Sequence, residues 1–230
     1  MPPESKTGRV LLVGAGPGPV DLLTLRAARA IEGAQALLYD ALVSDEVLAL
    51  APAQCLRIQT GKRAGRPSMR QETINRLMLR LARRGLSVVR LKGGDPSIFG
   101  RVGEEQAFLA AGGIESEVVP GVTAACAAAA QFGFPLTHRG EARRVMFTTA
   151  RLEAGAVQCD WAQAADPQTT VAIYMGAAAS AQVAARLLRG DLAGLGGLVP
   201  AGVQGPVLLV VGPVAALARP QVEELVQAAA

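Results

Sequence analysis

Hydrophobic and polar positions form two kinds of segment along the chain. Short runs of Val, Leu and Ile, typical of buried strands, alternate with longer stretches of Ala, Leu and Arg, typical of amphipathic helices. This alternation indicates a mostly parallel sheet with helices on both faces. Through about residue 134 it predicts strands at 10–13, 36–39, 56–59, 87–91 and 117–119, and helices at 21–32, 45–50, 69–84, 104–111 and 123–130.

A second set of elements follows a segment that breaks this pattern. Residues 133–140, with the sequence GFPLTHRG, predict a linker. The second set comprises strands at 145–149, 170–175 and 207–211 and helices at 181–188 and 221–227. We therefore predict an α/β protein of two domains, residues 1–136 and 137–230, with the ligand site in the cleft between them.

Composition narrows the functional classes. Half of the 230 residues are hydrophobic and 18% are charged, which is typical of a globular protein and not of a disordered one. Aromatic residues are only 3%, which argues against a protein that stacks single-stranded bases on rings. Cys55, Cys126 and Cys159 are widely spaced and His138 is the only histidine, so neither a disulfide framework nor a metal site is expected.

Net charge and targeting signals narrow the functional class less than composition does. Lysine and arginine total 23 against 19 acidic residues, and nearly all the basic residues are arginine. This composition fits either a GC-rich coding sequence or guanidinium groups that bind anions. The apolar runs are too short to span a bilayer, and the N-terminal residues do not resemble a signal peptide. We expect a cytoplasmic protein with neither a nucleic-acid nor a membrane partner.

A glycine- and proline-rich segment follows the first predicted strand. Residues 14–19, GAGPGP, resemble a dinucleotide-binding turn, and Asp40 supplies an acid at the end of the next strand. However, Pro19 stands where that motif needs Gly or Ala, and proline lacks the amide that would bind a pyrophosphate. A nicotinamide site and a purely structural turn both remain open.

A second glycine-rich segment, LKGGDPSIFGR at 91–101, follows another predicted strand. Its paired glycines allow close backbone approach, and Asp95 offers an acceptor at the carboxyl end of the sheet, where open α/β sheets bind ligands. Arg101 and Glu104 come together at the start of the next helix. A tight turn with a favourable helix-start acid would explain Glu104 but not the whole segment.

Shorter motifs have both a structural and a functional interpretation. Aspartate is common in turns, so Asp40 has a structural interpretation, and it is also a candidate catalytic acid. The basic loop TGKRAGR at 60–66 is not a phosphate-binding Walker loop, because Arg63 stands where Ser or Thr is needed. Three further motifs are VPGVTAA at 119–125, PLTHRG at 135–140 and YMG at 174–176.

The order of these motifs is more specific than any one of them. GAGPG, YDxLVS, GKRAG, LKGGDPxIFGR, VPGVTAA, PLTHRG and YMG, in this succession, strongly resemble the uroporphyrinogen III C-methyltransferases of the tetrapyrrole methylase family. The resemblance covers roughly residues 8–190 and resumes at 205–217. It implies a homodimer in which an S-adenosylmethionine-dependent reaction methylates carbons 2 and 7 of uroporphyrinogen III. The product is precorrin-2, at the branch to sirohaem, cobalamin and haem d1.

The resemblance also implies roles for individual residues. Asp40 and Lys62 match the family's acid–base pair, and Arg101 and Glu104 match positions linked to proton removal or binding. The carboxylate-rich substrate would be bound by Arg63, Arg139, His138 and Arg143. The positions that match the family's cofactor contacts are Pro17, Gly93, Gly94, Asp95, Ile98, Thr123, Ala124 and Met175.

Two departures from the family pattern bear on activity. Ala41 stands where many members have Arg after the acid at position 40. After Leu188, the family continues with a strand and its hairpin partner, which this sequence lacks. The second domain is therefore expected to miss a β-hairpin and part of the adenosine pocket wall.

Two alternatives to methylation of uroporphyrinogen III remain open. One is a sibling methyltransferase acting on a later corrin intermediate, and the other is an inactive relative that binds tetrapyrrole without turnover.

Overall fold

The computed structural model describes residues 7–61, 69–150, 152–153, 156–157, 166–175 and 208–218. It divides the chain into two compact units, Met1–Ala124 and Ala125–Ala230. The domain boundary predicted after residue 136 stays a prediction, as does the cleft. The helices predicted at 181–188 and 221–227 lie outside the described residues, and so does the segment after Leu188 in which a hairpin is expected to be missing.

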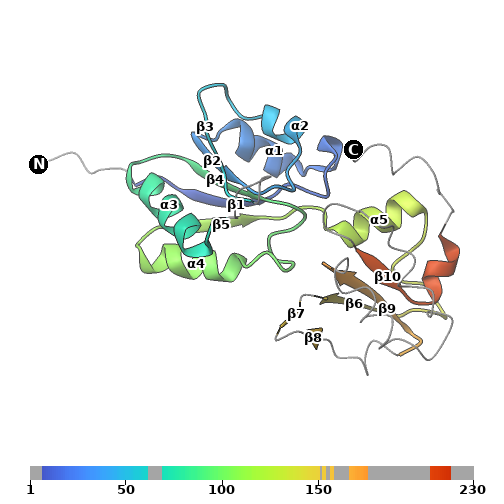
Figure 1. The fold of residues 1–230 in the computed structure, drawn as a ribbon. Coiled ribbons are helices and arrows are strands. Elements are labelled where there is room, and N and C mark those ends of the chain that lie inside the picture. Colours follow the sequence, from blue (N-terminus) through green and yellow to red (C-terminus); the bar gives the residue numbers. More distant parts are fainter. Residues whose placement is uncertain are drawn as a thin grey trace, which may run out of the picture. The chain divides into compact units, whose positions relative to one another are not determined.

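A five-stranded parallel sheet forms the centre of the first unit (Figure 1). The strand order is β3-β2-β4-β1-β5, so β1 lies between β4 and β5. Because all strands are parallel, their carboxyl ends meet at one edge of the sheet. The strands are β1 (Val10–Gly14), β2 (Ala36–Tyr39), β3 (Leu56–Gln59), β4 (Val88–Lys92) and β5 (Ser116–Val119).

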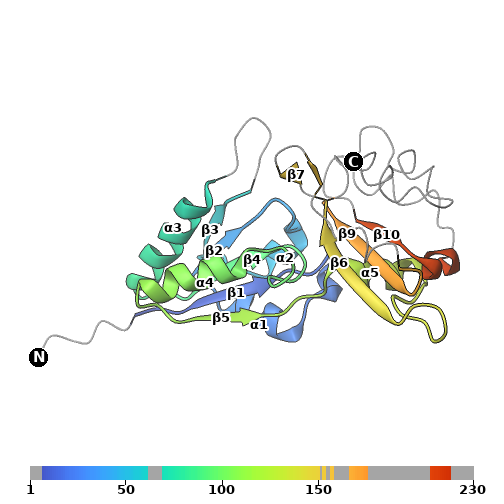
Figure 2. The same ribbon diagram turned by 90° about the horizontal axis from the view of Figure 1, so that it is seen from below.

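Helices cover both faces of this sheet (Figures 1 and 2). Alternate residues of β1 face opposite layers, as the period of a strand requires. Leu11 and Val13 pack with α1 and α2, whereas Val10 and Leu12 pack with α3 and α4. The predicted parallel α/β architecture is confirmed. The helices are α1 (Leu25–Glu32), α2 (Asp45–Ala49), α3 (Gln71–Arg83) and α4 (Val102–Ala111).

One helix predicted as continuous, at 21–32, is interrupted. A short 3-10 turn, η1 (Val20–Leu22), is followed by α1, which begins at Leu25. The prediction is wrong because Thr24 acts as an N-cap: its hydroxyl accepts a hydrogen bond from the Ala27 amide at 3.1 Å. The same hydroxyl donates to the Pro120 carbonyl at 3.2 Å, which joins the start of α1 to the loop after β5.

The second unit contains a three-stranded sheet of order β10-β9-β6. Strand β6 is parallel to β9, and β10 is antiparallel to β9. Phe134 is buried with Ala129, Ala142 and Val214, so the segment predicted as a linker packs into the core of this unit. No described helix has the length and apolar character needed to cross a membrane. The elements are α5 (Ala124–Phe132), β6 (Arg144–Thr149), β9 (Thr169–Tyr174), β10 (Leu209–Val211), η4 (Pro213–Leu217) and an unpredicted hairpin of β7 (Leu152–Glu153) and β8 (Ala156–Val157).

Candidate active site

Three loops meet at the carboxyl edge of the first unit's sheet, with glycine backbone against glycine backbone. A Cβ atom added to Gly121 would lie 2.2 Å from the Gly94 carbonyl oxygen and 2.9 Å from the Gly14 Cα atom. The loops after β1 and β4 are also hydrogen-bonded, since the Gly94 amide donates to the Gly16 carbonyl at 2.6 Å. No side chain fits between these backbones, which explains glycine at positions 14 and 121.

Asp95 ties the loop after β4 to the loop after β5. Its Oδ2 accepts a hydrogen bond from the Gly121 amide at 3.0 Å, and its Oδ1 accepts one from the Ser97 amide at 2.7 Å. The sequence predicted Asp95 as a cofactor acceptor. In the structure both of its carboxylate oxygens accept hydrogen bonds from backbone amides, so Asp95 also fixes the loops, and its contact with a cofactor stays a prediction.

Asp40 makes the corresponding connection on the other side of β4. Its Oδ2 accepts from the Gly93 amide at 3.2 Å, and its Oδ1 accepts from the Leu42 amide at 3.0 Å. The side chain is half-buried and retains acceptor capacity beyond these two bonds.

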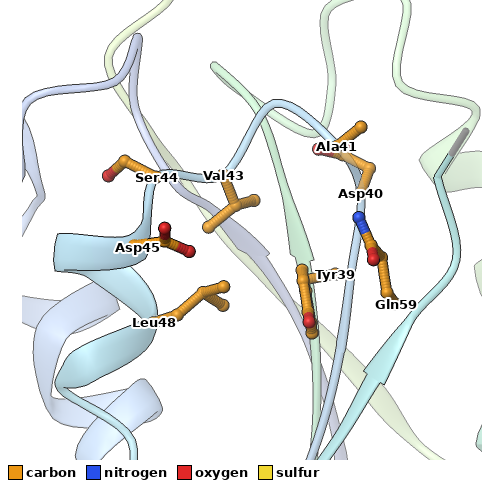
Figure 3. Close-up of a pocket in the computed structure, with 8 residues that line it drawn as sticks. All are labelled: Tyr39, Asp40, Ala41, Val43, Ser44, Asp45, Leu48 and Gln59. Carbon is orange, nitrogen blue, oxygen red and sulfur yellow. The ribbon is translucent and has the colours of Figure 1, made fainter. Parts of the chain in front are cut away.

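A cavity of about 310 Å³ adjoins Asp40 between β2, β3 and α2 (Figure 3). Two of the residues that line it, Asp40 and Asp45, are acidic, so the cavity is unsuited to an anion. Its lining residues are Tyr39, Asp40, Ala41, Val43, Ser44, Asp45, Leu48 and Gln59.

Arg101 and Glu104 form a bidentate ion pair at the start of α4. The guanidinium donates from Nε to Glu104 Oε1 at 2.8 Å and from Nη2 to Oε2 at 2.7 Å. These hydrogen bonds hold the pKa of Glu104 below its usual value and raise the pKa of Arg101. Arg101 is therefore a cationic donor and not a proton acceptor. It also adopts a left-handed backbone conformation, with φ of 58°, which is uncommon outside glycine and is enriched at functional sites.

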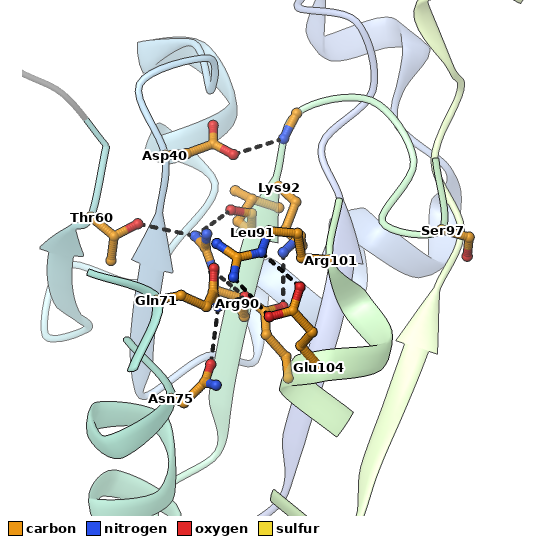
Figure 4. A network of polar contacts seen from close by, with 12 residues as sticks. Asp40, Thr60, Gln71, Asn75, Arg90, Leu91, Lys92, Ser97, Arg101 and Glu104 are labelled. Atoms are coloured by element: carbon orange, nitrogen blue, oxygen red, sulfur yellow. Dashed lines mark hydrogen bonds and ion pairs between the residues drawn. The ribbon is translucent and has the colours of Figure 1, made fainter. Parts of the chain in front are cut away.

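A buried group of charged and polar side chains, the Glu105 cluster, lies between β4, α3 and α4 (Figure 4). Its members are Glu105, Arg90, Lys92, Thr60, Gln71 and Asn75. Glu105 is fully buried; its Oε2 is 2.8 Å from Lys92 Nζ and its Oε1 is 3.3 Å from Arg90 Nε. Burial lowers the pKa of the Lys92 ammonium, and the Glu105 carboxylate opposes that shift.

The Glu105 cluster was not among the predicted site residues, although the chain contains a signal for it. Val88, Arg90 and Lys92 alternate on one face of a strand that the pattern predicts as buried. Buried cations require an acidic partner, because an unpaired charge in the interior is very costly. That acid is Glu105, on the helix that follows the strand and its loop.

Four further predicted residues of the first unit follow strands that end at this edge of the sheet. Pro17 is in the loop after β1 and Ile98 is in the loop after β4. Thr123 directly precedes α5, and Ala124 is its first residue. Lys62 and Arg63 lie outside the described residues.

The second unit carries the other predicted residues. Met175 follows β9 with φ of 58° and is 40% exposed. His138 Nδ1 is 3.9 Å from Glu141 Oε2, and Arg143 Nη2 donates to Gln168 Oε1 at 2.8 Å. Arg139 is exposed in the same segment. A common site formed by these residues and the loops of the first unit stays a prediction.

Known proteins similar to this chain share one enzyme family. A family model described as Tetrapyrrole (Corrin/Porphyrin) Methylases matches residues 9–197. The uroporphyrinogen-III C-methyltransferase of Paracoccus denitrificans is 53% identical over 183 residues, covering 79% of this chain and 64% of that enzyme. A siroheme synthase of Chromobacterium violaceum is 44% identical over 238 residues, covering 93% of this chain and 51% of that protein.

These alignments show two differences in length. The chain spans 51% and 64% of the two relatives, so each contains regions without a counterpart here. The alignment with the Chromobacterium protein has 238 positions, more than the 230 residues of this chain, so it also contains gaps within this sequence.

A solved structure is similar over most of the chain. The crystal structure of uroporphyrin-III C-methyl transferase from Thermus thermophilus, complexed with S-adenyl homocysteine, has a TM-score of 0.76 and 39% sequence identity. The match covers 91% of this chain and 100% of the Thermus chain. With the family model covering most of the sequence, these similarities are decisive: the chain belongs to the tetrapyrrole methylase family.

Proposed function

We propose that this protein transfers methyl groups from S-adenosylmethionine to carbons 2 and 7 of uroporphyrinogen III, giving precorrin-2. One observation carries the proposal: the glycine-lined junction of the loops after β1, β4 and β5 occurs in a chain that matches the full length of the Thermus enzyme crystallised with S-adenyl homocysteine. The matching relative from Paracoccus denitrificans is named for the same reaction.

The junction suits an adenosine and a sulfonium better than a phosphate. Pro17 and Pro19 have no amide to donate, and the amides of Gly16 and Gly94 bond across the junction. At Gly94, whose φ is +68°, the space that a Cβ atom would occupy is open. When bound, S-adenosylmethionine would supply an electrophilic methyl group. The residues proposed to hold it are Pro17, Gly93, Gly94, Asp95, Ile98, Thr123, Ala124 and Met175.

The topology disfavours the nicotinamide alternative. A dinucleotide-binding sheet has its first strand next to the second, whereas here β4 lies between β1 and β2. In addition, α1 begins at Leu25 after an intervening 3-10 turn, so the glycine-rich loop does not lead directly into a helix N-terminus.

A proton must leave the macrocycle after the new carbon–carbon bond forms, and Asp40 is the group proposed to accept it. Its carboxylate is oriented by the Gly93 and Leu42 amides and adjoins a cavity. Arg101, held as a cation by Glu104, is proposed to orient the substrate. Lys62 is proposed to assist as the second member of the acid–base pair.

Binding of the substrate's carboxylates is assigned to basic side chains. Guanidinium groups match carboxylates in a bidentate geometry, so Arg63, Arg139 and Arg143 are proposed as clamps, with His138 as a further donor. The cavity beside Asp40 carries two acids and is not expected to take a carboxylate arm. We further propose that the protein works as a homodimer in the cytoplasm, which size-exclusion chromatography and cell fractionation would test.

The first experiment is calorimetric titration of the purified protein with S-adenosylmethionine under reducing conditions. Binding in the micromolar range, followed by S-adenosylhomocysteine release with uroporphyrinogen III, would support the proposal. Binding without release would favour the inactive relative. Release only with a later corrin intermediate would favour the sibling methyltransferase. A folded protein that binds no S-adenosylmethionine would overturn both methyltransferase hypotheses and leave the inactive relative.

A further inference from the structure

The Glu105 cluster touches the loop after β4 at both of its ends. Lys92 is the residue before Gly93, where the loop begins. Its Cε atom would lie 3.2 Å from a Cβ atom on Gly100, so the lysine stem also lies against the far end of the loop. Glu105 fixes the ammonium of this side chain at 2.8 Å. One buried ion pair therefore fixes a side chain that lies against both ends of the loop that carries Asp95.

Arg90 connects the same cluster to β2 and β3. Its Nη1 donates to Thr60 Oγ1 at 3.2 Å, and that hydroxyl donates to the Tyr39 carbonyl at 2.9 Å. Tyr39 directly precedes Asp40, and Thr60 comes two residues before Lys62. The cluster thus reaches the ends of three neighbouring strands, each of which leads into a proposed catalytic or cofactor-binding residue.

Helix α3 completes the contacts of the carboxylate. Gln71 Nε2 donates to Glu105 Oε1 at 2.9 Å and to Asn75 Oδ1 at 3.0 Å. Glu105 follows Glu104 on α4, so its own position is linked to the Arg101–Glu104 pair. A single residue with no access to solvent is in contact, directly or through one or two partners, with every described segment that carries a proposed acid–base group.

We propose that Glu105 is a positioning residue for the active site: by holding Lys92 and Arg90 in one arrangement beneath the carboxyl edge of the sheet, it fixes Asp40, the loop at 93–100 and the start of α4. The inference rests on the proposed function and goes beyond it, because Glu105 acts through its partners and not by contact with a substrate.

The charge balance distinguishes this role from simple structural support. Two buried cations share one buried carboxylate, so the cluster carries an excess positive charge next to Asp40. The charged groups that face Lys92 are Glu105 and Glu104 from α4, Arg90 from its own strand and Asp40 from the loop after β2; α3 and β3 contribute the neutral Gln71, Asn75 and Thr60. Burial lowers the pKa of Lys92, and Glu105 is the strongest opposing influence. Loss of Glu105 would therefore lower that pKa further.

The test compares the wild-type chain with Glu105→Gln, Lys92→Met and a control, Glu72→Gln. Glu72 lies exposed on α3, where it forms a surface ion pair with Arg76. S-adenosylhomocysteine formation from S-adenosylmethionine and uroporphyrinogen III is followed from about pH 6 to about pH 10. Affinity for S-adenosylhomocysteine is measured by calorimetry, and folding by circular dichroism.

We expect Glu105→Gln to lower kcat roughly 10- to 100-fold, to move the alkaline limb of its pH profile to lower pH and to raise KM for S-adenosylmethionine, because the loop at 93–100 carries proposed cofactor contacts. Lys92→Met keeps the stem volume and leaves Arg90 and Glu105 paired one to one. This variant is expected to fold and to have a kcat lowered by a similar factor. Its pH profile should not show the shifted alkaline limb, because the lysine that titrates there is gone. Glu72→Gln should match wild type.

Two results would overturn the inference. One is a folded Lys92→Met variant with wild-type kcat and pH profile. The other is a Glu105→Gln variant that is less stable but keeps the wild-type pH profile, which would reduce Glu105 to a structural role. If the wild-type chain binds S-adenosylhomocysteine and yet forms none, the proposed function fails first, and the inference fails with it.

Discussion

Replacement of Asp95 separates loop bracing from direct contact with the cofactor. Asp95→Ala removes the acceptors of two backbone amides, Gly121 and Ser97. A hydrogen bond to a charged group contributes about 1.5–3 kcal/mol to stability. Because Ser97 is exposed, its amide regains water after the change, and only the Gly121 bond is expected to contribute at nearly full value. The expected loss in the free energy of unfolding is therefore about 2–3 kcal/mol.

Asp95→Asn provides the matched comparison. Its single carbonyl oxygen can serve one of the two amides, so a loss of about 1–1.5 kcal/mol is expected. Denaturation by guanidinium, followed by circular dichroism, gives both values, and calorimetry gives the affinity for S-adenosylhomocysteine. If Asp95→Ala unfolds within about 0.5 kcal/mol of wild type but loses the ligand, the carboxylate contacts the cofactor directly and the bracing argument is refuted.

Three further predictions follow from the first unit. Gly121→Ala forces a Cβ atom against the Gly94 carbonyl; it should destabilise the protein by about 1–3 kcal/mol and weaken S-adenosylhomocysteine binding, as denaturation and calorimetry would report. Thr24→Ala removes the N-cap of α1 and should cost about 1 kcal/mol, visible as a lower Tm; an unchanged Tm would contradict the capping role. Lys92 has a lowered pKa in the folded state, so between that pKa and its ordinary value of 10.5 the unfolded chain binds more protons. The free energy of unfolding should rise with pH across this window, and Lys92→Met should abolish its share of the rise in denaturation experiments at several pH values.

Much of the fold of the first unit follows from the residue pattern. The apolar run of β1 and the regular βα spacing predict a buried parallel strand, and the contacts of Leu11 and Leu12 with opposite helical layers confirm it. The break before α1 was missed because the apolar residues continue through it. The Thr24 hydroxyl determines where the helix begins, because it accepts from the Ala27 amide and donates to the Pro120 carbonyl, which is far away in sequence.

The candidate site was predictable where it depends on strand ends and not where it depends on a helix face. Asp40 and Gly93 follow neighbouring parallel strands, and their hydrogen bond is the expected consequence. Glu104 and Glu105, in contrast, are adjacent acids on a helix without a clear apolar stripe. The neighbouring sequence does not indicate which of the two is buried. Glu105 is buried because it pairs with Arg90 and Lys92 on β4, whereas Glu104 stays exposed and pairs with Arg101.

The position of β1 in the sheet has a consequence for folding during synthesis. Val10 pairs with Val88 and Ser116, so β1 precedes both of its partner strands in the chain. At ribosomal elongation rates, roughly 4 to 16 s separate the synthesis of Val10 from that of Val88. During that interval an apolar strand has neither neighbour with which to pair, which is the condition under which nascent chains aggregate or need a chaperone. Fragments that end before β4 are accordingly expected to aggregate, whereas chains extending through β5 contain all five strands of the sheet.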